Sequence, residues 1–332
     1  MQALADAHYL PPGRHFQQSA QRQLDCYSQR TSDCLAHTAG VTGDGVARRE
    51  QGNIMQNAKL PQGWPDDRPL AVSVSVMLEG WAAPDAPGLG PMGNLLKSGT
   101  VDRQARSWAG YGPKVGAWRL LDLLEQERVT AVFYTSGVVA ELFPALPAAI
   151  AEAGHDVSAH GWSQGTLPAY LTPEQEAADI ARCVAVLTAT AGSPPAGWLS
   201  PRCTPSASTS ALLAAQGFTF QAEMFDTDLP YRIETPSGSL IGVPFTMEVN
   251  DMPLYVRYGN EPDAFTRTLT KIVEGWPRLG SPFGCLDITV HAHVFGRPYG
   301  ALALLDSLAA VRRSPHSWLT NHAELAAVWA GI

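Results

Sequence analysis

Residues 286–298 read Leu-Asp-Ile-Thr-Val-His-Ala-His-Val-Phe-Gly-Arg-Pro, and this stretch decides the fold. Its first half is a short apolar run of the kind that forms a buried strand. The run ends in His291 and His293. Side chains at the end of a buried strand are held rigidly at the mouth of a sheet, where the active sites of α/β enzymes lie. Taken alone, each histidine could equally be a buried residue bonded to a backbone carbonyl.

Composition narrows the class of protein. The chain has 332 residues, 45% of them hydrophobic and 16% charged, with a net charge of −8. No basic cluster resembles a nucleic-acid footprint, so nucleic acid is not an expected partner. No apolar run approaches the ~18 residues of a membrane span, and the N-terminus lacks the features of a secretion signal. We therefore expect a soluble, cytoplasmic protein with no membrane partner.

The chain divides into two parts by pattern. Residues 1–60 are rich in Gln, Arg, Ser and Asp without a sustained period, which predicts an irregular N-terminal extension, either disordered or packed on the surface. Residues 61–332 alternate short apolar β-type runs with helical segments, the pattern of a parallel sheet wrapped by helices. We expect a single catalytic domain there.

About seven β/α units emerge from this pattern, which predicts a barrel or near-barrel. The expected strands are 70–77, 130–135, 156–159, 197–199, 239–244, 286–291 and 318–320. The best-marked helices are 114–126, 173–190 with Thr172 as its N-cap, and 208–216 ending before Gly217.

Polar side chains follow four of these strands. Glu79 comes after the first strand, His160 after the third, Arg202 after the fourth, and His291 ends the last long one. The carboxyl ends of parallel barrel strands lie on one rim, so residues over 200 positions apart would meet in one pocket.

These segments resemble the polysaccharide deacetylase superfamily over roughly residues 60 to 330. Its acidic motif is matched by Val76-Met77-Leu78-Glu79-Gly80, its histidine motif by residues 154–162, its arginine motif by Leu199-Ser200-Pro201-Arg202, and its final histidine by His291. Within the superfamily, the allantoinase and cyclic-imide hydrolase branch is the most similar. The similar segments are Tyr111-Gly112, Gly116-x-Trp118-Arg119, residues 227–231, 244–246 and 250–252, and the last motif at 291–298. The resemblance implies a distorted (β/α)7 barrel that hydrolyses a non-peptide amide bond.

The departures from the superfamily concern the metal. Its sugar deacetylases typically bind a divalent ion through one aspartate and two histidines spaced His-x-x-x-His. Here Leu78-Glu79 replaces the aspartate pair and Gln164 the second histidine. A glutamine carbonyl is a poor ligand for zinc, and the cyclic-amide branch works without an obligatory metal, so we expect no cofactor. A weakly bound divalent ion at Glu79, His160 and Gln164 is the alternative.

The resemblance implies a role for each residue on the rim. Glu79 would be the general base, its pKa raised toward neutrality by burial. His160 would orient water or substrate, and His291 would be the general acid. The other candidate acid is His293, for which we expect a substrate contact or a structural role. Arg202 would bind a carboxylate or imide oxygen, or pair with Glu79 in a buried ion pair.

A flat pocket for a planar ring is expected around these residues, with Trp81 close by. The residues expected to contact substrate are Trp162, Gln164, Tyr231, Phe245, Asn250, Asp251 and His293. Packing for the aromatic residues, and a backbone-bonded turn for Asn250 and Asp251, are the alternatives.

The sequence thus predicts a hydrolase, a homo-oligomer as in the branch it resembles, that opens a small cyclic amide or imide such as allantoin. A metal-dependent carbohydrate N-deacetylase and a degenerate barrel that binds a small ligand without turnover are the alternatives.

Overall fold

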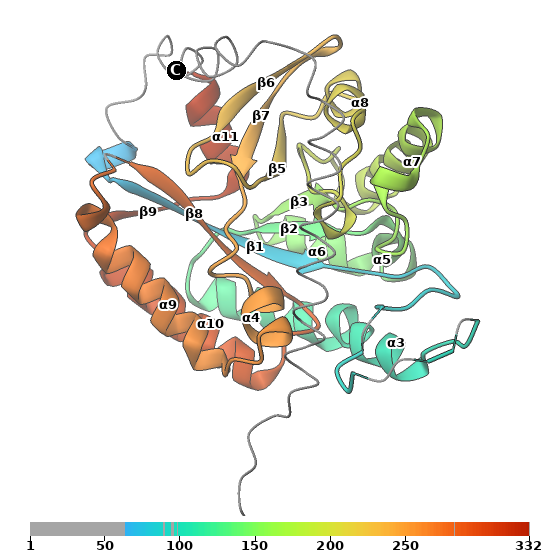
Figure 1. Ribbon diagram of the computed structural model, residues 1–332, viewed down its shortest axis with the longest axis horizontal. Helices are drawn as coiled ribbons and strands as arrows, with labels where there is room; N and C mark the ends of the chain where they lie inside the picture. The colour runs from blue at the N-terminus through green and yellow to red at the C-terminus, as the bar shows by residue number, and fades with distance from the viewer. Residues whose placement is uncertain (1–63, 89, 94–95, 98, 282, 332) are drawn as a thin grey trace, which may run out of the picture. The chain divides into compact units, whose positions relative to one another are not determined.

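The computed structural model describes residues 64–331, apart from 89, 94–95, 98 and 282 (Figure 1). The extension expected at residues 1–60 lies outside the described residues, and its boundary stays a prediction. The first described segment is a short 3₁₀ turn, η1 (Pro65–Asp67), which leads directly into the central strand β1 (Leu70–Leu78).

One curled sheet organises the described residues. Its other strands are β2 (Val132–Thr135), β3 (Asp156–Ala159), β4 (Gly197–Trp198), β5 (Phe220–Met224), β6 (Tyr231–Thr235), β7 (Gly238–Pro244), β8 (Gly284–His291) and β9 (Ser317–Leu319). The order is β6-β7-β5-β4-β3-β2-β1-β8, with β9 paired to β1. Every pairing is parallel except that of β6 with β7. Seven parallel strands run from β7 to β8, which confirms the distorted (β/α)7 barrel.

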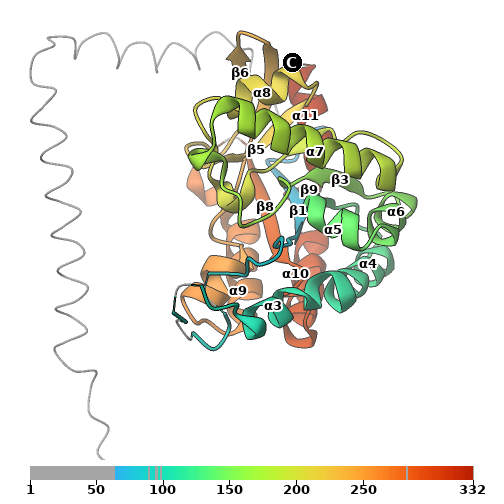
Figure 2. The ribbon, with the colours of Figure 1, turned by 90° about the vertical axis from the view of Figure 1, so that its right-hand side faces the viewer.

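Helices pack around the sheet. They are α3 (Arg103–Ala109), α4 (Ala117–Gln126), α5 (Gly137–Leu142), α6 (Ala145–Glu152), α7 (Pro173–Ala191), α8 (Thr209–Ala215), α9 (Pro262–Gly275), α10 (Pro298–Arg313) and α11 (His322–Ala330). The short turns are two π-helices, η2 (Gly112–Gly116) and η5 (Met252–Arg257), and the 3₁₀ helices η3 (Pro168–Tyr170), η4 (Pro201–Cys203) and η6 (Trp276–Leu279). Figure 2 shows α4, α5, α6 and α7 along one side of the sheet.

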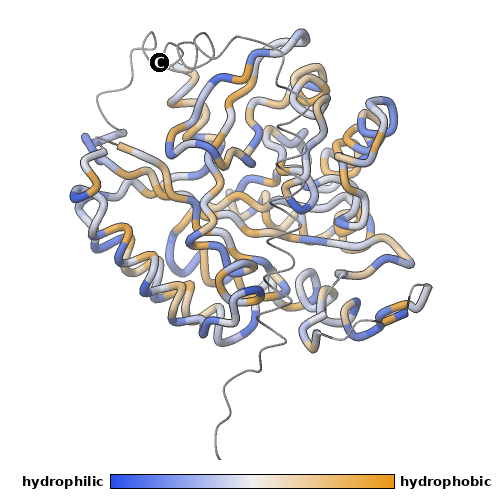
Figure 3. Tube along the Cα trace, viewed as in Figure 1, coloured by the Kyte–Doolittle hydropathy of each residue, from blue (hydrophilic) through white to orange (hydrophobic). Residues whose placement is uncertain are grey.

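Successive side chains of β1 point to opposite faces of the sheet and so belong to two different hydrophobic cores. Val72, Val74 and Val76 pack against the outer helices, whereas Ala71 and Met77 belong to the inner core of the curled sheet. Helix α11 contributes to that inner core, and apolar residues mark the central strands in Figure 3. The two-residue period of a strand places the next inward side chain, Glu79, at the carboxyl end of β1.

The free edge of β8 is covered by the chain that follows β7. Thr289 donates its backbone N–H to Val249 O at 2.9 Å, and Asp287 donates its own to Thr246 Oγ1 at 2.9 Å. A parallel bridge joins Asn250 to Thr289. This segment stands in for a strand neighbour of β8 and brings Asp251 to the rim that carries His291.

Two strands, β5 and β6, were not predicted from the sequence, and one predicted helix begins in another conformation than expected. β5 places the polar residues Gln221 and Glu223 in the interior, and β6 is a half-buried edge strand, so neither shows an apolar run. The helix expected at 114–126 starts as the π-helix η2 before continuing as α4. Thr172 caps α7 as predicted and forms a capping box with Gln175.

Helix η2 lies directly against the loop that carries His293. A Cβ on Gly116 would lie 1.8 Å from Ala292 O, and one on Gly296 would lie 2.1 Å from the same oxygen. Arg119 donates to Tyr111 Oη at 2.6 Å and to Gly296 O. Glycine is required at 116 and 296 because the two backbones approach too closely for a side chain.

We predict that Gly116→Ala lowers the free energy of unfolding by roughly 1–3 kcal/mol, because the new methyl group overlaps a backbone oxygen. The φ of Gly116 is −66°, so backbone strain does not contribute. Chemical denaturation measures the change. Gly275→Ala is the matched control, since a Cβ there meets nothing within 4 Å. Equal stability of the two variants would contradict the close contact.

Candidate active site

A buried carboxylate faced by three imidazoles forms the centre of the site. Glu79 Oε1 lies 3.7 Å from His160 Nε2 and 3.9 Å from His291 Nε2, and Glu79 Oε2 lies 3.8 Å from His293 Nε2. These gaps exceed hydrogen-bond length and suit groups that share a water or substrate atom between them. The structure thus brings together Glu79, His160 and His291, which the sequence placed on one rim.

The ionisation of Glu79 differs from the expectation. Burial raises the pKa of this carboxyl group, but His291, His160 and His293 together lower it by more, and the pKa falls to about 2. The predicted pKa near neutrality is therefore wrong. A carboxylate this well matched with imidazoles is ionised throughout the neutral range.

His291 is held by Asp251. Asp251 Oδ1 lies 2.6 Å from His291 Nδ1, and Oδ2 accepts the backbone N–H of His291 at 2.8 Å and that of Phe295 at 3.3 Å. Burial lowers the pKa of His291, but Asp251 and Glu79 raise it by more, to above its ordinary value of 6.5. Both carboxylates therefore favour the protonated imidazole, in which Nδ1–H faces Asp251 and Nε2–H faces Glu79.

Asp251 is thus misassigned as a substrate contact. Its side chain is fully buried, and both oxygens are occupied by His291 and Phe295. Asn250 also departs from that prediction, because its Oδ1 accepts the backbone N–H of Met252 at 2.9 Å in a local turn. The pattern Asn-Asp marked a turn, and the turn positions a carboxylate behind a histidine.

His293 is neutral and only partly bonded. Burial lowers its pKa to about 4, and Glu79 opposes this shift only in part. Its Nε2 and the nearby Trp81 Nε1 are buried and have no hydrogen-bond partner among the described residues. The His293 ring meets Trp81 and Trp108 edge to face, with centroids 5.9 and 4.5 Å away. Nothing in the sequence around Trp108 marked it as a neighbour of the site.

His160 and Gln164 form a fixed unit beside Glu79. His160 Nδ1 lies 2.8 Å from Leu199 O, so Nδ1 carries a proton, and Nε2 faces Glu79. The Gln164 amide donates to Ser136 Oγ and His160 O, each at 3.1 Å, and its oxygen accepts the Arg202 N–H at 3.2 Å.

These bonds decide whether the residues fit a metal. Both amide hydrogens and the oxygen of Gln164 already have protein partners, which makes the set Glu79, His160 and Gln164 a poor fit for a divalent ion. Across residues 64–331, outside the few positions left undescribed, no group of three or more His, Cys, Asp or Glu could hold a metal ion.

The side chain of Arg202 is exposed and forms no ion pair with Glu79. Its backbone is left-handed, with φ at +53°, which turns its N–H toward Gln164. The buried ion pair considered for Arg202 is therefore absent, and the side chains that face Glu79 are the three histidines.

The predicted aromatic residues separate into two groups. Trp162 packs in the core beneath the helices, with Arg182 Cζ 3.3 Å above its ring, so its contacts are those of packing. Phe245 follows β7 in the inner core and meets Phe225 at 5.7 Å. Tyr231 opens β6 and donates to Met224 Sδ at 2.8 Å. Only these last two come from strand ends on the side of the rim.

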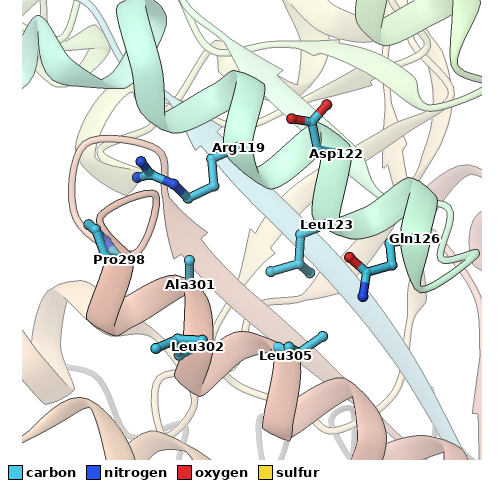
Figure 4. A pocket seen from close by; sticks show the side chains of 8 residues that line it. All are labelled: Arg119, Asp122, Leu123, Gln126, Pro298, Ala301, Leu302 and Leu305. Atoms are coloured by element: carbon cyan, nitrogen blue, oxygen red, sulfur yellow. The ribbon is translucent and has the colours of Figure 1, made fainter.

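A cavity of about 840 Å³ borders the site through Trp108 and Val294, with Tyr111, Tyr255 and Arg297 among its other walls. A smaller cavity of about 360 Å³ lies between α4 and α10 (Figure 4). Figure 4 shows Arg119 reaching from α4 toward the loop before α10. Neither cavity is lined by Glu79 or by the three histidines that face it. The larger cavity lies next to the site, because its wall residue Trp108 contacts the His293 ring.

Comparison with known proteins supports this reading. The family model for polysaccharide deacetylase matches residues 110–221. A Schizosaccharomyces pombe protein named "Putative polysaccharide deacetylase" is 24% identical over 69% of this chain and 77% of its own length. Peptidoglycan deacetylase of Helicobacter pylori is 28% identical over 50% of this chain and 55% of its own length. The Puue allantoinase structure has a TM-score of 0.75 at 23% identity, covering 81% of this chain and 93% of that one.

The fold and the site define a hydrolase of carbon–nitrogen bonds other than peptide bonds. The chain is similar to polysaccharide deacetylases over residues 110–221, within the region whose motifs resemble that superfamily. Within the described residues no helix is long and apolar enough to cross a membrane.

We predict that Asp251→Asn lowers the pKa of His291, because the negative charge that raises it is removed. His291 then loses its proton at lower pH than in the wild type. NMR titration of the imidazole resonances measures the shift. His155, on the far side of β2 and bonded to Ala131 N, is the internal control and should not move. An unchanged titration of His291 would contradict the assigned contact.

Proposed function

We propose that the protein opens a small cyclic amide or imide by hydrolysis without a metal. The observation that supports this most directly is the ionised Glu79 facing three imidazole nitrogens, one of them backed by Asp251. This arrangement supplies both a proton acceptor and a proton donor at one point. The fold shared with Puue allantoinase is compatible with such a reaction.

In this proposal Glu79 accepts a proton from the attacking water. His160 Nε2 faces the same point as Glu79 Oε1 and helps to orient this water toward the carbonyl carbon. A carboxylate with a pKa of about 2 is a weak base in the free protein. Its basicity rises during the reaction, because the positive charge on His291 that depresses its pKa leaves as the proton moves.

His291 donates that proton to the departing nitrogen. Its Nε2 lies on the same side of the site as Glu79 Oε1, and Asp251 holds the ring in one orientation. A buried aspartate behind a histidine stabilises the imidazolium and fixes its tautomer. The transfer therefore couples the two residues: His291 loses a proton as Glu79 gains one.

The carbonyl oxygen of the substrate needs hydrogen-bond donors as it becomes negative. Trp81 Nε1 is a buried, unpartnered donor, and neutral His293 can donate through Nε2 in the matching tautomer. Both rings meet edge to face, so the two nitrogens serve one region.

A sugar N-deacetylase is the second candidate, because the family model and both sequence relatives carry deacetylase names. It shares the amide chemistry and differs in substrate and in the metal its usual members need. The fully bonded Gln164 argues against that metal set.

The experiment that tests the function is a panel of allantoin, hydantoin, succinimide and N-acetylglucosamine oligomers, each assayed after exhaustive chelation and again with added Zn²⁺ or Mn²⁺. We expect ring opening that survives chelation. Activity only on the acetylated sugars, and only with metal, would favour the deacetylase instead.

We predict that Glu79→Gln lowers the turnover number by roughly 10²–10⁴-fold while substrate affinity stays within a few-fold, because glutamine keeps the shape but cannot accept the proton. Calorimetry measures affinity and a coupled assay measures turnover. Glu141→Gln, which removes an exposed carboxylate paired with Arg182, is the matched control and should keep full activity. Unchanged turnover in Glu79→Gln would reject Glu79 as the base.

A further inference from the structure

The large cavity beside the active site has one charged side chain among its described wall residues. That side chain is Arg297, and no acidic residue occurs in the described part of the wall. Its remaining walls are aromatic, aliphatic and neutral polar residues, including Trp108, Tyr111 and Tyr255. A single cation in an otherwise uncharged cavity selects for the sign of a ligand's charge.

Arg297 is held in place with its terminal amino groups unused. Its Nε donates to His293 O at 3.1 Å, and its Cζ lies 4.1 Å from the Tyr111 ring centroid. The ring contact orients the guanidinium plane. Among the described residues, no carboxylate lies within ion-pairing distance and no acceptor bonds the two terminal nitrogens. A planar fork of this kind matches a carboxylate.

Arg297 is also connected to the reacting centre. It bonds the backbone oxygen of His293, whose Nε2 lies 3.8 Å from Glu79. A substrate carboxylate cannot sit close to Glu79, because both are negative. The geometry therefore separates the two ends of a ligand, with the amide at Glu79 and an anionic group at Arg297.

We propose that the substrate of this site is a cyclic amide that carries a carboxylate arm, and that Arg297 binds that carboxylate. The inference rests on the proposed function and specifies its substrate class. The cavity volume of about 840 Å³ agrees with this, since a five-membered cyclic amide alone fills only part of it.

The test compares hydantoin with hydantoin-5-acetate, which differ by one carboxylate-bearing arm. Binding is measured by calorimetry on the full chain carrying Glu79→Gln, so that turnover does not interfere, and kcat/KM is measured on the wild type. We expect the wild-type enzyme to prefer hydantoin-5-acetate. Arg297→Gln should reduce this preference for hydantoin-5-acetate over hydantoin roughly 10- to 100-fold.

Two variants make the comparison specific. Arg297→Lys keeps the charge without the fork and should retain part of the preference. Arg313→Gln removes the same charge from the opposite end of α10, about 24 Å away by helix rise, and should have no effect. Equal losses for both ligands in Arg297→Gln, or no preference in the wild type, would overturn the inference.

The outcomes separate this inference from the proposed function. Binding that prefers hydantoin-5-acetate and depends on Arg297, without turnover of either ligand, would support the anion site and reject the hydrolase proposal. Turnover of hydantoin and hydantoin-5-acetate at equal kcat/KM would support the hydrolase and reject the anion site.

Discussion

The buried negative charge of Glu79 is the constraint that determines which groups surround it in the site. A carboxylate taken out of water must be compensated nearby, and leaving one partner of a buried ion pair alone costs roughly 3–5 kcal/mol. Here three imidazoles face the carboxylate, from His160 just after β3, His291 at the end of β8 and His293 in the loop after β8. Because imidazoles gain and lose protons near neutral pH, the same groups that stabilise the charge can also move it.

The incomplete barrel makes this arrangement possible. Since β8 pairs with β1 alone among the described strands, its other edge is open to the segment after β7. That segment brings Asp251 behind His291, which a regular strand could not do, because strand side chains point above and below the sheet. The π-helix η2 holds the opposite side of the same loop through Gly116 and Arg119.

Much of the fold could be read from sequence, because parallel buried strands show as apolar runs and their ends mark one rim. Glu79, His160 and His291 were found this way. The direction of the Glu79 pKa shift was not, since it depends on three imidazoles brought together by distant segments. Asp251 and Gln164 were identified as site residues but not by role, because a polar side chain's partner is a property of the folded structure. Trp108 could not be predicted as a neighbour of the site, because an aromatic residue in a short helix is common and does not by itself indicate a functional position.

One covering segment therefore performs two tasks, closing the edge of the sheet and holding the acid of the proposed reaction. Its attachment to β8 is a few hydrogen bonds, against the continuous ladder between β1 and β8. Local opening of that edge would release Asp251 from His291 while the seven-stranded sheet stayed intact. Catalytic competence and global folding are thus separate equilibria in this molecule, with the first the easier to lose.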